Sequence, residues 1–140
     1  MKYLRSILFV FTALLLANAA QAQSTNVTAS VAFDFVVADH AYPAGDYAVK
    51  SISDSGVPIL IRNKDEAERG VALSIPCSSV KPSSTTKLVF HHMGGQYFLY
   101  QVWTEGNSLG REFPKSKREI QLAKNNSQPE LVMVAANISH

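Results

Sequence analysis

The chain has 140 residues, of which 46% are hydrophobic and 17% charged, with a formal net charge of +2. Lys2 and Arg5 account for that whole surplus, so the remainder carries 13 − 2 = 11 basic and 11 acidic side chains. A neutral domain gives no reason to expect nucleic acid as a partner, because nucleic-acid binding needs a concentrated positive face.

The first 22 residues have the pattern of a secretory signal peptide. Lys2 and Arg5 precede an apolar run over residues 7–17, and Ala20 and Ala22 then occupy the −3 and −1 positions. The run is shorter than the roughly 20 residues of a spanning helix. We therefore predict cleavage after Ala22 and one exported β-rich domain over residues 23–140. It would be periplasmic or extracellular, with no transmembrane segment after processing.

The first half of this domain predicts short strands separated by turns. Apolar and polar residues alternate from Val27 to Val37, as in a half-buried strand. Pro43 and Gly45 predict a turn before a second strand. Runs at 57–62 and 71–76 predict a third and a fourth strand. The residues expected on the inner face of the first strand are Val27, Ala29, Val31, Phe33, Phe35 and Val37.

A polar connection, CSSVKPSSTT, follows over residues 77–86. Its length suits a crossing between sheets. Cys77 is the only cysteine, so no internal disulfide can form and the apolar core must hold the domain together. We interpret Cys77 as a small half-buried hydrophobe rather than a reactive thiol.

Gly94-Gly95 lies between two apolar runs and predicts a tight hairpin. Counting outward from this turn pairs His92 with Tyr97 and His91 with Phe98. Successive strand residues point to opposite faces, so His91 and His92 cannot chelate one ion. We therefore expect packing or hydrogen-bonding histidines, with no metal site and no cofactor.

Both faces of this hairpin are largely apolar. We expect one face to carry Leu88, Phe90, His92, Tyr97, Leu99, Gln101 and Trp103, and the other Val89, His91, Met93, Phe98, Tyr100 and Val102. The hairpin is then either covered on both sides, with a docked helix as the second cover, or it binds a partner through its outer face.

That helix is predicted within PKSKREIQLAK, where Ser116 and Glu119 have the spacing of a capping box. Ile120 and Ala123 are expected to share one face of this helix, and the run over residues 130–136 predicts a last strand. The fold expected is a single all-β domain. It would be an antiparallel sandwich or partly closed barrel of about seven strands, with one short C-terminal helix.

No nucleophile elbow, zinc-protease motif or phosphate loop occurs in the chain. The function favoured is a non-enzymatic binding or structural module for a protein or cell-envelope partner. Two alternatives stay open: a small-ligand carrier with a barrel interior lined by Phe33, Phe35, Tyr97 and Trp103, and a metal-dependent or acid/base hydrolase using His91 or His92. The candidate binding residues on the hairpin are His91, His92, Tyr97, Phe98, Tyr100 and Trp103.

Several segments together resemble a family of small exported proteins of acidobacterial-type soil bacteria. They are FDFVV at Phe33–Val37, PAGDY at Pro43–Tyr47, KLVFH ending at Phe90-His91, QVW at Gln101–Trp103 and GREFPKS at Gly110–Ser116. The family is uncharacterised. The resemblance therefore implies bacterial origin and export, and it assigns no catalytic residue.

Overall fold

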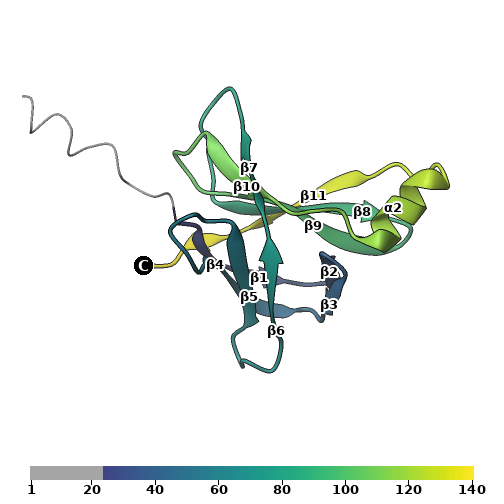
Figure 1. Ribbon diagram of the computed structural model, residues 1–140, viewed down its shortest axis with the longest axis horizontal. Coiled ribbons are helices and arrows are strands. Elements are labelled where there is room, and N and C mark those ends of the chain that lie inside the picture. The colour runs from purple at the N-terminus through teal and green to yellow at the C-terminus, as the bar shows by residue number, and fades with distance from the viewer. Residues whose placement is uncertain (1–23) are drawn as a thin grey trace, which may run out of the picture.

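The computed structural model of the protein describes residues 24–140, which form two β-sheets and one short helix (Figure 1). The predicted signal peptide and its cleavage site lie outside the described residues. Within residues 24–140, no helix is both long and apolar enough to cross a membrane.

The first sheet, called sheet A, is entirely antiparallel and has five strands. In spatial order these are β12 (Asn137–Ile138), β1 (Asn26–Val31), β4 (Gly45–Ser51), β5 (Pro58–Asn63) and β6 (Arg69–Leu73). The first and last strands of residues 24–140 are therefore neighbours.

The second sheet, called sheet B, has seven strands and contains the Gly94-Gly95 hairpin. Its main path runs β11 (Glu130–Ala135), β8 (Lys87–Met93), β9 (Gln96–Trp103), β10 (Leu109–Glu112) and β7 (Ile75–Ser78). The small strand β2 (Phe35–Val37) pairs in parallel with β9 and antiparallel with β3 (His40–Tyr42). Helix α2 (Lys117–Lys124) lies at the turn end of β8 and β9 (Figure 1).

The run from Val27 to Val37, expected as one strand, is divided between the two sheets. β1 ends in sheet A at Val31, and β2 begins in sheet B at Phe35. Between them, Asp34 accepts a hydrogen bond of 2.9 Å from the backbone N–H of Ala44, which ties the crossing to the next turn. The expected alternation survives, since five of the six predicted inner residues are buried and Phe33 packs against the core.

The run at 71–76 is divided in the same way at Ser74. This residue is buried, its N–H donates to Val57 O at 2.7 Å, and its hydroxyl reaches the same oxygen at 3.0 Å. The chain thereby passes from β6 at an edge of sheet A to β7 at an edge of sheet B. Such divisions and the very short strands explain why residues 24–140 contain twelve strands rather than about seven.

The core fills the space between the two sheets, and the fold is a sandwich rather than a closed barrel. Large side chains from both sheets are completely or almost completely buried there, each stabilising the fold by about 1.5–3 kcal/mol. Ring contacts join the sheets, because Phe35 of sheet B meets Tyr47 of sheet A edge-on at 5.0 Å. The all-β sandwich with one short C-terminal helix confirms the predicted fold class.

Candidate functional site

The hairpin formed by β8 and β9 has the predicted register near its turn. His92 lies opposite Tyr97, His91 opposite Phe98, and Phe90 opposite Leu99. Gly94 and Gly95 have φ values of 59° and 72°, in the left-handed region that favours glycine at a tight turn. The two histidines consequently point to opposite faces of sheet B.

A β-bulge at Tyr100 changes the faces further along this hairpin. Phe90 pairs with Leu99 but Val89 pairs with Gln101, so Tyr100 has no partner in the register. Beyond it, Val102 joins the core opposite Leu88. The expected placement of Gln101, Val102 and Trp103 was therefore wrong: Val102 faces inward, and Gln101 and Trp103 share the outer face with Tyr100.

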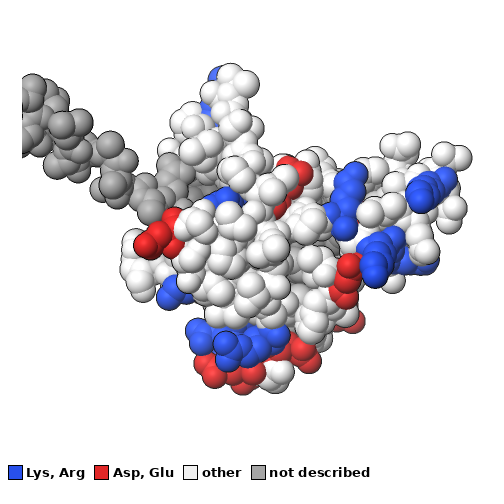
Figure 2. Space-filling view, in the orientation of Figure 1, with Lys and Arg blue, Asp and Glu red and all other residues white. Residues whose placement is uncertain are grey.

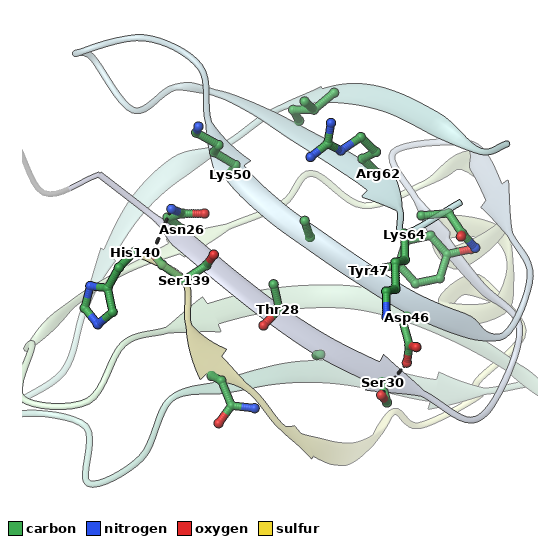
Figure 3. Close-up of a pocket in the computed structure, with 15 residues that line it drawn as sticks. Asn26, Thr28, Ser30, Asp46, Tyr47, Lys50, Arg62, Lys64, Ser139 and His140 are labelled. Atoms are coloured by element: carbon green, nitrogen blue, oxygen red, sulfur yellow. Dashed lines mark hydrogen bonds between the residues drawn. The ribbon is translucent and has the colours of Figure 1, made fainter. Parts of the chain in front are cut away.

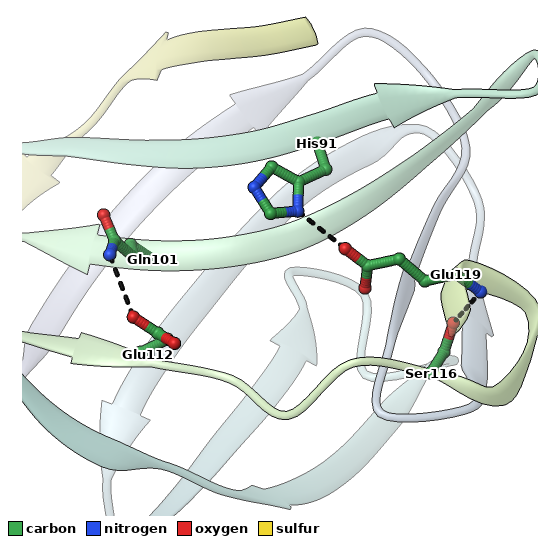
Figure 4. Close-up of polar contacts among 5 residues, drawn as sticks. All are labelled: His91, Gln101, Glu112, Ser116 and Glu119. Carbon is green, nitrogen blue, oxygen red and sulfur yellow. Dashed lines mark hydrogen bonds and ion pairs between the residues drawn. The ribbon is translucent and has the colours of Figure 1, made fainter. Parts of the chain in front are cut away.

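His91 lies on the outer face and is fixed by helix α2. Its Nδ1 is 2.6 Å from Oε1 of Glu119, and the two side chains are only 10% and 7% exposed (Figure 4). The imidazole stacks on Tyr100 with ring centroids 4.0 Å apart. The backbone N–H of Glu119 donates to the Ser116 hydroxyl at 3.1 Å. Glu119 therefore takes part in the helix cap through its backbone and in the contact with His91 through its carboxylate.

His92 belongs to the inner face, at the end of the sandwich. Its ring stacks on Tyr97 at 4.2 Å, and Tyr97 in turn stacks on Phe33 at 3.8 Å. The exposed carboxylate of Glu130 lies 3.6 Å from His92 Nδ1. No group of three metal-ligating side chains occurs within residues 24–140.

Helix α2 covers the outer face of the hairpin near its turn. Leu122 packs against Met93 and Phe98, which are 5% and 1% exposed. Ile120 and Ala123, which were expected to share one face of the helix, are both exposed, and Glu119 and Leu122 are the residues that face the sheet. The predicted cap at Ser116 is confirmed.

Hydrogen bonds link polar residues across the middle of this outer face. Gln101 donates to Glu112 at 3.1 Å (Figure 4). It also accepts a hydrogen bond of 3.0 Å from the Trp103 indole. Burial, followed by the nearby Glu112 carboxylate, raises the pKa of the Tyr100 hydroxyl. The same two causes raise the pKa of the half-buried Cys77 thiol, which therefore stays protonated at neutral pH.

The six candidate binding residues thus do not form one open surface. His92 and Tyr97 face inward, whereas the other four face outward. Of those four, His91, Phe98 and Trp103 are buried and Tyr100 is half-buried. What stays exposed beside them belongs to β11: Leu131 and Met133, opposite His91 and Val89, are 54% and 60% exposed.

The residues suggested as a carrier lining pack against one another instead. Phe33 touches Tyr97 and Phe90, and Phe35 touches Phe90 at 5.5 Å, all within the filled core. Trp103 lies on the outer face of sheet B, where its ring covers Gly110. This arrangement leaves the carrier alternative without the lined interior that it requires.

A second candidate site is a hollow of about 560 Å³ on the outer face of sheet A (Figure 3). It is lined by polar side chains, together with apolar ones such as Ala48 and Leu60, from β1, β4, β5 and the C-terminal residues. Lys50, Arg62 and Lys64 stand along one side, and Asp46 is hydrogen-bonded to Ser30. Sequence reasoning missed this hollow because its residues come from separate strands and form no local motif.

Glu119, Leu131 and Met133 were also missed as members of the hairpin surface. A signal for the last two did exist, because Leu131 and Met133 alternate with Val132 and Val134 in a strand that the sequence predicted. Comparisons with protein-family models, with curated proteins and with solved structures found no match. Functional interpretation therefore depends on the geometry of this chain.

Proposed function

We propose that the protein is an exported, non-enzymatic binding module that takes a protein partner onto the outer face of sheet B. The observation that carries this proposal is the exposed pair Leu131 and Met133, 54% and 60% accessible on strand β11. Large exposed apolar side chains that adjoin one another commonly mark contact sites.

The helix explains why the binding surface lies on β11 rather than on the hairpin itself. Leu122 already covers Met93 and Phe98, so those residues offer nothing to a partner. Leu131 and Met133 lie on the same outer face as His91 and Val89 but outside this cover. Gln101 of β9 and Glu112 of β10 are hydrogen-bonded to each other on the same face, beyond the buried Val89 of β8, and are polar as the rim residues of protein interfaces are.

Binding is favoured over hydrolysis by the surroundings of the two histidines. His91 and Glu119 have the spacing of a base and its partner, but both side chains are buried under α2. None of the three hollows described for residues 24–140 is lined by His91 or His92. The pair is therefore best interpreted as the attachment of the helix to the sheet.

Photo-cross-linking in the producing cell tests this function. A photoreactive residue at position 133 should give one cross-linked product of defined mass, identified by mass spectrometry, and the same residue at Val71 should not. The identified partner, purified, should bind a Leu131→Ser, Met133→Ser variant at least tenfold more weakly, since two buried apolar contacts are lost. Equal affinity, or the absence of a product specific to position 133, would contradict the proposal.

The matched control is Val71→Ser combined with Leu73→Ser. These two residues are as exposed as the pair on β11, at 58% and 66%, but they belong to sheet A. Affinity for the partner should be unchanged in this variant. A similar loss in both variants would indicate general apolar adhesion rather than a defined surface.

A further inference from the structure

Strand β11 has a paired neighbour on only one of its two edges. It pairs with β8, and within residues 24–140 no strand pairs with its other edge, called the free edge. One contact just past the strand shows which backbone groups face β8, because the N–H of Ala136 donates to Thr86 O at 3.0 Å. These two residues directly follow the pair Ala135 and Lys87, so they lie opposite each other in the register.

Hydrogen-bonded pairs alternate with non-bonded pairs along an antiparallel ladder. Counting back from Ala136, every second residue of β11 therefore bonds to β8. The residues between them direct their N–H and C=O groups toward the free edge: Leu131, Met133 and Ala135. The glycine turn gives the same result. Met93 and Gln96 flank this turn and bond to each other, as in a two-residue hairpin, so the next residue of β8, His92, bonds to β11.

The residues with free backbone groups are also those with exposed side chains. Leu131 and Met133 are 54% and 60% exposed, and Ala135 is exposed as well. On the inner face of the same strand, Val132 and Val134 pack against the core but are only half-buried. The sandwich is therefore incomplete on both faces at the free edge of β11.

The other sheet edges within the described residues are short or protected. β12 and β3 have two and three residues, and β7 contains Pro76, which lacks an N–H. β6 is longer, but its inner residue Ala72 is already buried. Figure 2 also shows Lys, Arg, Asp and Glu side chains gathered where β5 meets β6, and charged residues commonly protect an edge strand from pairing.

We propose that the partner binds by adding an extended segment of its own chain to the free edge of β11. This inference rests on the proposed function and specifies how the partner is recognised. The backbone of the segment would pair with Leu131, Met133 and Ala135, and apolar side chains on its two faces would extend the outer surface and cover the half-buried Val132 and Val134.

The backbone of β11 is the reason for choosing a polypeptide segment as the occupant. Its free donors and acceptors repeat every second residue, or about every 7 Å along the strand. Another extended peptide backbone has the same repeat and can satisfy each N–H and C=O in turn. A lipid or a sugar polymer could touch Leu131 and Met133, but neither presents donors and acceptors in that order.

Amide hydrogen exchange measured by NMR tests this mode of binding, with and without the purified partner captured at position 133. The N–H groups of Leu131, Met133 and Ala135 should exchange rapidly in the free protein. In the complex each should exchange at least about a hundredfold more slowly, because the added strand accepts a hydrogen bond from it. A complex that leaves these amides unprotected would overturn strand addition, and the proposed function would still stand.

The edge of β6 supplies the matched control for exchange. The N–H of Asn63 donates to Glu68 O, and counting from this bond directs the N–H groups of Val71 and Leu73 away from β5. These two amides should exchange equally fast in the free protein and in the complex. Protection of both edges would indicate a general tightening of the fold and would contradict the assignment to β11.

Two variants at one position isolate the backbone contribution. Ala135→Pro removes an N–H from the free edge, keeps the hydrogen bonds to β8 and leaves the side chains of Leu131 and Met133 in place. It should weaken partner binding by roughly tenfold, because a donor is lost and the ring hinders a neighbouring strand. Ala135→Ser keeps the N–H and should bind as the parent does. Equal affinities of two folded variants would refute the proposal, and if Ala135→Pro does not fold, the exchange measurement decides.

Cross-link mapping shows the conformation of the bound segment. Photoreactive residues placed in turn at positions 131, 133 and 135 should reach partner residues that advance by two along one segment, as in a strand. An advance of three or four would indicate a helix on the outer face and would overturn strand addition alone. Failure to capture any partner would contradict the proposed function as well. A dimer of the protein alone in sedimentation, with the β11 amides protected, would identify a second copy of this chain as the occupant instead.

Discussion

Glu119 of helix α2 accepts a hydrogen bond from His91 of strand β8, with Nδ1 and Oε1 2.6 Å apart and both side chains buried. In a complete capping box this glutamate would reach back to the backbone of Ser116. Here it points into the sheet, and the Ser116 hydroxyl alone caps the helix. The contact holds an eight-residue helix that would be marginal in isolation.

Replacing Glu119 by alanine should therefore destabilise the protein by about 1–3 kcal/mol, because the buried His91 loses its partner. Urea unfolding followed by circular dichroism measures the loss. Gln121→Ala, an exposed position on the same helix, is the control and should change the free energy of unfolding by less than about 0.5 kcal/mol. Equal effects would show that the contact contributes nothing.

The two histidines should differ in their sensitivity to phenylalanine. His91→Phe keeps the ring stacked on Tyr100 but leaves the Glu119 carboxylate buried without its donor, so a loss of about 1–3 kcal/mol is expected. His92→Phe keeps the ring stacked on Tyr97 and loses only the 3.6 Å contact with the exposed carboxylate of Glu130. Thermal unfolding of the two variants should rank His91→Phe as clearly the less stable.

Gly94 and Gly95 provide a second matched pair. Both have positive φ, so alanine at either position strains the backbone by about 1 kcal/mol. A Cβ at Gly94 would also lie 2.6 Å from Cδ2 of Leu122, whereas a Cβ at Gly95 meets nothing within 4 Å. Gly94→Ala should consequently be the more destabilising in urea unfolding. The opposite order would mean that α2 is not seated as described.

Alkaline pH should weaken the fold through Tyr42. Burial, with added repulsion from Tyr47 and Glu68, raises the pKa of Tyr42 to about 12 from 10.0. The unfolded chain therefore loses this proton first, so stability present below pH 10 declines as the pH rises toward 12. Tyr42→Phe should show a smaller decline over that interval in urea unfolding at a series of pH values. An identical decline in both proteins would refute this assignment.

The single tryptophan offers a direct test of the outer face of sheet B. A Cβ at Gly110 would lie 2.8 Å from both the Trp103 ring and the Val102 carbonyl, so Gly110→Ala must displace the indole. Its emission maximum should move to longer wavelength as water reaches the ring. Gly106→Ala, where a Cβ meets nothing within 4 Å, should leave the emission unchanged.

Local patterns predicted those parts of the structure that local forces determine. Gly94-Gly95 predicted the hairpin register as far as Phe90 and Leu99, and the serine before α2 predicted its cap. The bulge at Tyr100 was not predicted, because a bulge depends on how the strand fits its neighbours. One extra residue there was enough to place Val102 and Trp103 on faces opposite to those expected.

Features that depend on distant segments were the ones missed. In the sequence, the residues after Val31 and around Ser74 look like the interior of one continuous strand. Each run is divided only because its two halves belong to different sheets. The hollow on sheet A combines side chains from β1, β4, β5 and the C-terminal strand, none of which stands out alone. The basic residues of this hollow did not stand out in the sequence, because the domain as a whole has equal numbers of basic and acidic side chains.

The pairing of β1 with β12 bears on the order in which the two sheets can form during the export that we propose. Val27 of β1 lies opposite Ile138 of β12, and β8 pairs with β11 in the other sheet. Neither sheet can therefore be complete before residues near the end of the chain have joined it. A chain threaded through a translocation channel from its N-terminus would emerge with β1 and β4 long before β11 and β12. The sandwich would close only when the last residues had left the channel, which keeps the segment still inside it free of folded structure.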